Sequence, residues 1–361
     1  MLRTTRAGQT SWVVAVVAIA GWTSPAVAQE HATVRADVLF YGDDTEFRNR
    51  FREGETIFGA AVRGAAELVL NDRVTLAAGA FGNLRFGSDD AFEIVRPVLS
   101  LTIAGRRSAF VFGTLSTPVA GAPPGPDRTG PHGLLPPLQR ETLAFDRPYE
   151  AGIAWSFAGS AVRHGLWINW QRLNTREHRE RFDAGVAADV RLADHVALPC
   201  QLHVVHEGGQ LFASGPVADS VALATGLRVH GKPWNLEAAS IEAYGLLSRF
   251  VPDRSDASRS RDGAGFFARG AIEHHGWRGH LIAWRGDDFI KDEGDPNYLS
   301  IRRDGRYYRG VRDYAEAGLT RTFKPAAGVL VEASGRLHRI EKDYEYSFRI
   351  LARAAIAFRL R

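Results

Sequence analysis

The sequence is poor in several features, and three of these shortages argue against a disulfide, a membrane-spanning helix and nucleic-acid binding. Cys200 is the only cysteine, so no intrachain disulfide can form. The longest apolar run, residues 12–22, is about half the roughly twenty residues that a membrane-spanning helix requires. The net charge of +4 is small for 361 residues and gives no support to nucleic-acid binding. Lysine accounts for few of the 45 basic residues: Lys232, Lys291, Lys324 and Lys342.

The first 28 residues have the three-part layout of a secretory signal peptide. A basic start without acids, residues 1–6, precedes the apolar run, and Ala26-Val27-Ala28 is a small-x-small cleavage site. We therefore expect export through the inner membrane and removal of residues 1–28. The mature chain, residues 29–361, is expected to form one domain.

The remainder alternates with the period of two that is typical of β-strands. In the C-terminal segment, apolar side chains such as Phe348 and Ile350 occupy one face, and Arg349 and Arg353 occupy the other. A soluble sandwich would bury the apolar face in its core, whereas a membrane barrel turns it towards lipid. An open sheet edge in hydrocarbon would leave backbone groups unpaired, so a sheet in a membrane has to close.

About sixteen strand-like segments can be counted, and short and long connections take turns between them. An even number of strands with a tight turn after every second strand is the topology of outer-membrane barrels. The sequence therefore predicts an all-β fold, a closed antiparallel transmembrane β-barrel of about 16 strands, with 14 or 18 as alternatives. A soluble β-sandwich or propeller is the rival fold.

The longest connection, residues 117–149, is rich in proline and glycine and cannot be a strand. Its place after the fifth strand resembles that of the loop that folds into the lumen of sixteen-stranded porins, and the general plan resembles alginate-export barrels. The acidic loop motif and the terminal phenylalanine of porins are missing. The resemblance implies a constriction formed by charged residues of this loop, with a flexible outer loop as the alternative: Asp127, Arg128, Arg140, Glu141, Asp146 and Arg147.

Charged residues also fall on the strand faces that would point into the lumen. Unpaired arginines there would raise the local concentration of anions, whereas facing charges that pair would give a wall without selectivity. The wall residues of this prediction are Arg63, Glu67, Arg96, Arg191, Arg228, Arg269, Arg336, Arg349, Arg353 and Arg359.

Catalytic and metal-binding motifs have little support in the sequence. Ser160, Ser214 and Ser334 do not lie in a G-x-S-x-G nucleophile elbow. His203 and His206 are three positions apart, so a strand directs them to opposite faces. The acids of residues 287–295 do not match the spacing of a calcium loop, and a solvated outer loop is the default there, although divalent-cation binding stays open. We expect no enzyme activity, no cofactor and no metal.

These features together predict a water-filled channel in the bacterial outer membrane that passes hydrophilic solutes, with a preference for anions left open. Two alternatives stay open: an export pore for an anionic exopolysaccharide, and a plugged barrel that acts as a receptor or assembly partner. The expected partners are outer-membrane lipid, lipopolysaccharide and the solute or polysaccharide, without nucleic acid. Assembly into a homo-oligomer is also open.

Overall fold

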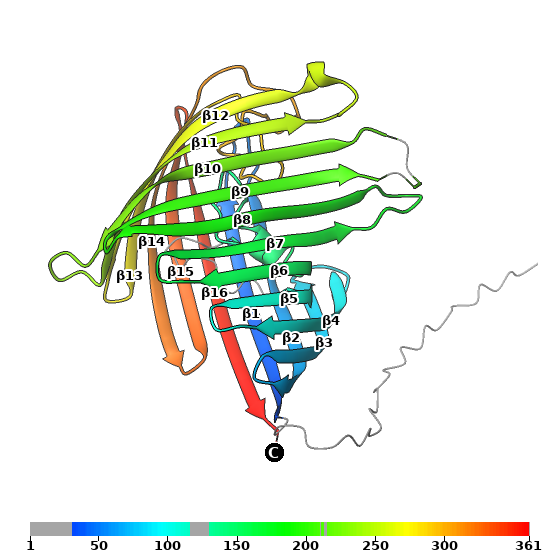
Figure 1. Cartoon of the computed structure of the whole chain (residues 1–361). Helices are drawn as coiled ribbons and strands as arrows, with labels where there is room; N and C mark the ends of the chain where they lie inside the picture. Colours follow the sequence, from blue (N-terminus) through cyan, green and yellow to red (C-terminus); the bar gives the residue numbers. More distant parts are fainter. Residues whose placement is uncertain (1–30, 116–129, 210, 213–214, 361) are drawn as a thin grey trace, which may run out of the picture.

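The computed structural model describes residues 31–115, 130–209, 211–212 and 215–360, so the expected signal peptide lies outside the described residues. Sixteen strands pair in chain order into one closed antiparallel barrel, with β16 beside β1 (Figure 1). The predicted sixteen-stranded barrel is confirmed. The strands are β1 His31–Glu46, β2 Glu55–Asn71, β3 Val74–Arg85, β4 Ile94–Ala104, β5 Ser108–Thr114, β6 Ala151–Ala158, β7 Val162–Arg172, β8 Glu180–Ala193, β9 Val196–Gly208, β10 Ala218–Gly231, β11 Ala238–Val251, β12 Arg261–His274, β13 Trp277–Asp287, β14 Arg312–Ala326, β15 Val329–Ile340 and β16 Asp343–Arg359.

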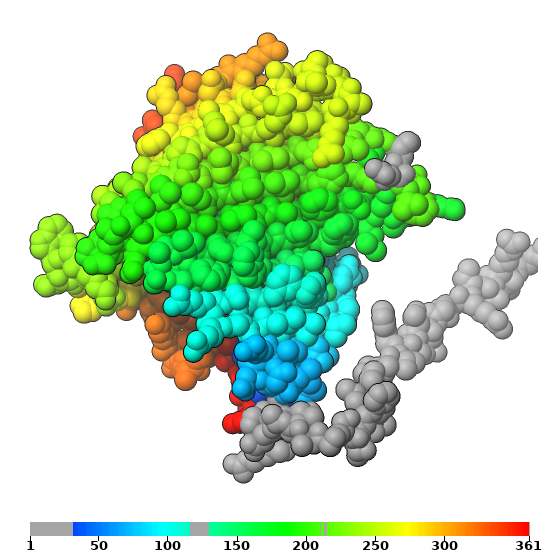
Figure 2. Space-filling model, in the orientation of Figure 1, coloured from blue at the N-terminus to red at the C-terminus, as the bar shows by residue number. Residues whose placement is uncertain are grey.

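The outer surface of the wall is apolar because alternate side chains of each strand point away from the lumen. Leu99, Ile241 and Leu281 are 65%, 71% and 65% exposed, while Val98 and Ser100 on either side of Leu99 are buried. Figure 2 shows segments that follow one another in the sequence packed side by side across the visible face, and the closed strand order leaves no open edge among the described strands. A closed wall with an apolar exterior meets the requirement of hydrocarbon that all backbone groups pair within the sheet.

The two ends of the barrel differ in their connections. The start of β1 pairs with the end of β16, so both ends of the barrel chain lie at one rim, and most turns there are short. The opposite rim, called here the outer rim, carries the long connections, of which residues 115–150 and 288–311 are the longest. The exception at the outer rim is the connection of β15 to β16, which has only two residues, 341–342.

Two of the long connections fold into the lumen. Leu135 and Leu138 from the first, and Phe289 and Tyr298 from the second, belong to one buried apolar cluster with inward side chains of strands β6–β8 and β10–β15. Among the described residues, no helix is long and apolar enough to cross a membrane. The helical turns α1 (Leu143–Asp146) and η1 (Ala257–Arg259) are each a single turn.

Candidate functional site

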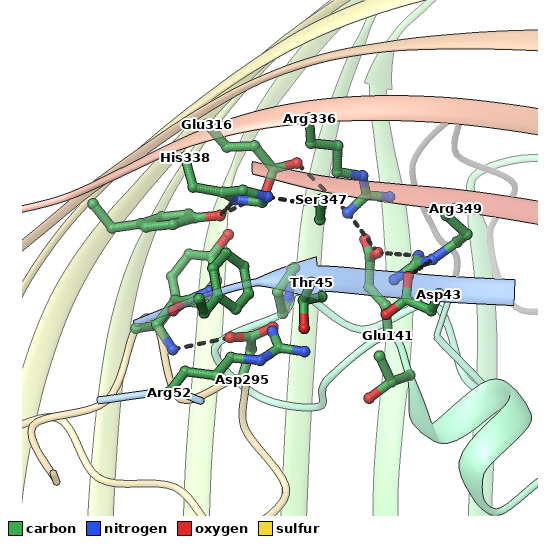
Figure 3. Close-up of a pocket in the computed structure, with 16 residues that line it drawn as sticks. Asp43, Thr45, Arg52, Glu141, Asp295, Glu316, Arg336, His338, Ser347 and Arg349 are labelled. Carbon is green, nitrogen blue, oxygen red and sulfur yellow. Dashed lines mark hydrogen bonds and ion pairs between the residues drawn. The ribbon is translucent and has the colours of Figure 1, made fainter. Parts of the chain in front are cut away.

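A narrow pocket lies at the outer end of the lumen, between the wall and the two inward loops (Figure 3). Strands β1, β14, β15 and β16 supply one side, and the loops 130–150 and 288–311, with Phe47 and Arg52 of the β1–β2 connection, supply the rest. The cavity volume is about 20 Å³, which holds about one water molecule. A larger group can enter this pocket only if an inward loop shifts.

The pocket contains a chain of four hydrogen-bonded side chains on three adjacent strands. Ser347 Oγ lies 2.8 Å from His338 Nε2, and His338 Nδ1 lies 2.8 Å from the hydroxyl of Tyr314. Tyr314 donates its hydroxyl hydrogen to Glu316 Oε2 at 2.6 Å. All four residues are buried.

The direction of these hydrogen bonds follows from the number of available hydrogens. Tyr314 has one hydroxyl hydrogen and gives it to Glu316, so it accepts a hydrogen from His338 Nδ1. The other ring nitrogen, Nε2, is then unprotonated in the neutral imidazole and accepts the hydroxyl hydrogen of Ser347. A hydroxyl that donates to an oriented imidazole is the arrangement of an activated serine nucleophile.

Guanidinium groups adjoin this chain in the pocket. Arg349 donates to Asp43 Oδ1 at 2.6 Å and to Glu141 Oε2 at 2.7 Å, and Arg336 donates to the same oxygen of Glu141 at 2.8 Å. Arg336 is the register partner of Ser347, and Arg349 lies two residues beyond Ser347 on the same face of β16. Two positive charges close to Ser347 suit the stabilisation of a developing oxyanion.

A larger cavity of about 320 Å³ lies elsewhere in the lumen and shares no lining residue with the first pocket. Its lining includes Arg96, Arg147, Arg181, Asp183 and Glu293.

A buried pair, His132 and Glu150, lies beside the larger cavity. His132 Nε2 is 3.1 Å from Glu150 Oε1, and its ring stacks on Trp167 with centroids 3.7 Å apart. Burial opposes the charged imidazolium, but the Glu150 carboxylate raises the pKa of His132 above its ordinary value. For the Glu150 carboxyl, burial itself raises the pKa above its ordinary value. Both groups therefore retain protons more strongly than they would in water.

The charged residues predicted in the long loop lie inside the barrel where the structure describes them. Arg140 donates to Asp146 at 2.6 Å, Asp146 also pairs with Arg85, and Arg147 donates to Glu293 at 2.6 Å. Glu141 lies between Arg336 and Arg349. Asp127 and Arg128 lie outside the described residues. That these residues limit conduction stays a prediction.

Several arginines of the predicted wall have acidic or carbonyl partners. Arg228 lies 2.5 Å from Asp189, and Arg269 lies 3.2 Å from Glu242. Arg35 lies 3.5 Å from Glu67. Arg63 and Arg96 donate to backbone carbonyls at 3.1 and 3.2 Å, while Arg191, Arg353 and Arg359 are exposed. Pairing of this kind favours the alternative of a wall without selectivity, and anion preference stays a prediction.

The sequence did not predict the four hydrogen-bonded side chains that include Ser347, because they come from three different strands. Ser347, His338 and Glu316 fall on inward faces by alternation, but no short motif joins them. The register places Ser347 opposite Arg336 and His338 opposite Glu345, which brings the side chains within reach. The inward alternation and the tight turn after Ile340 were the available signals.

The fold is similar to that of solved outer-membrane porins. A loop L8 deletion mutant of OmpT from Vibrio cholerae matches with a TM-score of 0.56 and 11% identity, covering 91% of this chain and 99% of that one. The trimer form of OmpT from Vibrio cholerae matches with a TM-score of 0.53 and 10% identity, covering 91% and 100%. An anion-selective porin from Comamonas acidovorans matches with a TM-score of 0.52 and 10% identity, covering 91% and 100%.

These similarities confirm the predicted porin-like β-barrel, the fold of the outer-membrane proteins named above. At such low identity they show the fold alone. No curated protein matches the sequence significantly.

A family model described as Lipid A 3'-O-deacylase-type matches residues 25–361. The deacylase family is an enzyme family, so the prediction that the chain is not an enzyme is wrong. That prediction relied on the absence of a contiguous serine motif. Residues that meet only across paired strands form no such motif. The match spans nearly the whole chain, and the protein therefore belongs to the lipid A 3'-O-deacylase-type family.

Proposed function

We propose that this barrel hydrolyses an ester-linked acyl chain of a lipid A-type glycolipid, with Ser347 as the nucleophile. The observation that carries the proposal is the 2.8 Å contact of Ser347 Oγ with His338 Nε2 in a member of a deacylase family. His338 is oriented by Tyr314, and Tyr314 in turn is held by Glu316. Each link of a nucleophile, base and orienting group is thus present.

In the proposed reaction, Ser347 Oγ attacks the ester carbonyl while its proton passes to His338 Nε2. The ester bond then breaks, and the imidazolium returns that proton to the departing sugar hydroxyl. Water attacks the acyl-serine, with His338 accepting its proton and returning it to Ser347 as the fatty acid leaves. The guanidinium groups of Arg336 and Arg349 would stabilise the negative oxygen in both tetrahedral intermediates.

The position of the pocket supports a membrane lipid as substrate. His338 and Ser347 lie three and five residues from the two-residue connection 341–342, near the outer rim of the barrel. Tyr344 and Tyr346 next to this turn are 70% and 48% exposed, as suits residues at the interface of headgroups and acyl chains. Ester groups of a membrane lipid lie at the same interface.

The test is covalent trapping by a serine-directed alkyl fluorophosphonate, followed by peptide mass spectrometry and by mass spectrometry of lipid A. Labelling of Ser347, its loss in Ser347→Ala and loss of one acyl chain from lipid A are the expected results. Ser156→Ala is the matched control, because Ser156 is also buried but lies across the barrel on β6. Label on another serine, or equal labelling of His338→Gln, contradicts the proposal.

A channel for small anionic solutes is a second candidate, favoured by the larger cavity. Arg96, Arg147, Arg172 and Arg181 all line it. Reversal potentials in a planar bilayer test this candidate, and cation preference would contradict it. Polysaccharide export, a receptor role and homo-oligomerisation stay predictions.

A further inference from the structure

A second group of chemically active side chains lies in the lumen, on residues that the proposed hydrolysis does not use. Asp183 of β8, His203 of β9 and Glu293 of the β13–β14 connection each offer one oxygen or nitrogen atom that could bind a metal ion. These three atoms lie within 4.8 Å of one another. Their side chains are 1%, 0% and 3% exposed. The cluster therefore brings one imidazole and two carboxylates together from segments far apart in the chain.

His203 is held in one orientation by the inward loop. Its Nδ1 lies 3.1 Å from the carbonyl oxygen of Leu138, which can only accept, so Nδ1 carries the hydrogen. In the neutral ring, Nε2 then carries a lone pair that faces Asp183 Oδ2, 3.5 Å away, and Glu293 Oε2, 3.8 Å away. Within the described residues, neither Nε2 nor Glu293 Oε2 has a hydrogen-bond partner.

The two carboxylates are also fixed from behind. Asp183 accepts hydrogen bonds from Trp167, Asn169 and Gln171, each at 2.8 Å. The side-chain hydrogen bonds of Glu293 all use Oε1, which accepts from Arg147 at 2.6 Å, Gln171 at 2.8 Å and Arg181 at 3.3 Å. Polar partners that orient imidazole and carboxylate ligands in this way are the usual surroundings of a protein metal site.

The positive charges near the cluster are engaged on its far side. Arg147 and Arg181 bind the Oε1 edge of Glu293, and Arg181 also pairs with Asp292 at 2.8 Å. The ammonium group of Lys291 donates to the carbonyl oxygen of Asp292 at 2.7 Å. The face shared by His203 Nε2, Asp183 Oδ2 and Glu293 Oε2 is left for another partner.

We propose that Asp183, His203 and Glu293 bind a divalent transition-metal ion of the zinc class. Ligand atoms about 2.0–2.1 Å from one tetrahedral zinc ion are about 3.3 Å apart, close to the 3.5 and 3.8 Å separations here. The imidazole ligand favours zinc-class ions over calcium and magnesium, which prefer oxygen ligands alone.

The proposed ion would lie at the edge of the cavity of about 320 Å³. Asp183 and Glu293 both line that cavity, so a fourth coordination position would face it. Three protein ligands with one open position are the pattern of a zinc site that takes water or a small anionic ligand. Arg96 and Arg147 on the cavity wall suit a carboxylate or phosphate group as that ligand.

The test uses the full barrel in detergent, stripped with a chelator, dialysed and titrated with Zn²⁺ alone by calorimetry. Bound zinc is counted by elemental mass spectrometry. We expect about one tightly bound Zn²⁺ per chain, and His203→Gln and Asp183→Asn should each weaken binding at least 100-fold. His206→Gln is the matched control, because His206 lies on the same strand but contacts Asp219 instead.

Circular dichroism first establishes that each variant retains the β-barrel fold. If Asp183→Asn does not, Asp183→Ser takes its place. Equal zinc binding by wild type and His203→Gln would overturn the proposal, because surface imidazoles would then account for it. Tighter binding of Ca²⁺ or Mg²⁺ than of Zn²⁺ would overturn the assigned class of ion. Zinc binding that survives in Ser347→Ala supports a site separate from the proposed hydrolytic chain.

Discussion

Arg349 and Glu141 lie 2.7 Å apart although 208 residues separate them in the sequence. The contact joins the last strand of the barrel to the loop that fills its lumen, and Arg336 of β15 donates to the same carboxylate oxygen. Since β16 also closes the barrel against β1, one strand both completes the wall and holds the inward loop.

Replacing Glu141 with alanine should release the inward loop from this part of the wall. Both arginines would lose a half-buried acidic partner, but Arg349 keeps Asp43 and Arg336 keeps Glu316, so the cost should stay below the about 3–5 kcal/mol of an uncompensated buried charge. We expect a larger single-channel conductance in a planar bilayer. Glu177→Ala, in an exposed connection, is the control. Unchanged conductance in Glu141→Ala would show that this contact does not hold the loop closed.

Replacing Tyr314 with phenylalanine should remove the group that orients the His338 ring and leave the contact of His338 with Ser347 in place. The variant keeps the ring but loses the hydroxyl that links Glu316 to His338 Nδ1. We expect ester hydrolysis to fall by about 100-fold, at the lower end of the usual contribution of a positioned acid or base. The measurement is kcat against pH for wild type and variant. An unaltered pH profile and rate would refute the relay through Tyr314.

An arginine on the outer face should destabilise the barrel according to its depth. Leu281 lies in the middle of β13 and is 65% exposed, whereas Leu192 lies near the end of β8 and is 57% exposed. Leu281→Arg should cost about 2–4 kcal/mol in a bilayer and Leu192→Arg about 0–1 kcal/mol. Reversible denaturant unfolding in lipid vesicles measures both. Equal costs would contradict the assignment of this face to lipid.

The buried pair His132 and Glu150 should make stability depend on pH. Both folded pKa values are raised, so the folded chain binds more protons than the unfolded chain over the affected range. Each group contributes its full stabilisation below its ordinary pKa, which is 4.5 for Glu150 and 6.5 for His132. That stabilisation is lost as the pH rises through the raised pKa of the folded state. Wild-type Tm should therefore fall more from pH 5 to pH 8 than that of the double variant His132→Gln, Glu150→Gln. The same pH dependence in both proteins would remove this pair as its cause.

Much of the fold was accessible from sequence because the bilayer imposes regular rules. Alternation identified the lipid-facing side chains, such as Phe348 and Ile350, and the order of short and long connections predicted sixteen strands. Leu135 and Leu138 of the long loop lie in the buried cluster of the lumen, and constriction of the pore by this loop stays a prediction. Strand periodicity succeeds here because one side of every strand must be apolar.

The candidate site was not accessible in the same way, because it depends on register and on long-range contacts. Ser347, His338 and Glu316 carry no spacing signature, and their meeting follows from how β14, β15 and β16 pair. The pairing of His203 with Glu293 likewise needs the β13–β14 connection to enter the lumen, which its polar composition did not suggest. Side chains that meet only in three dimensions leave no local pattern to recognise.

The central claim is most directly tested by the release of fatty acid from purified lipid A in mixed micelles. Wild-type barrel should release one fatty acid per lipid A molecule, Ser156→Ala should do the same, and folded Ser347→Ala should release none above background. Undiminished release by Ser347→Ala, or no release by the folded wild type, would contradict the account.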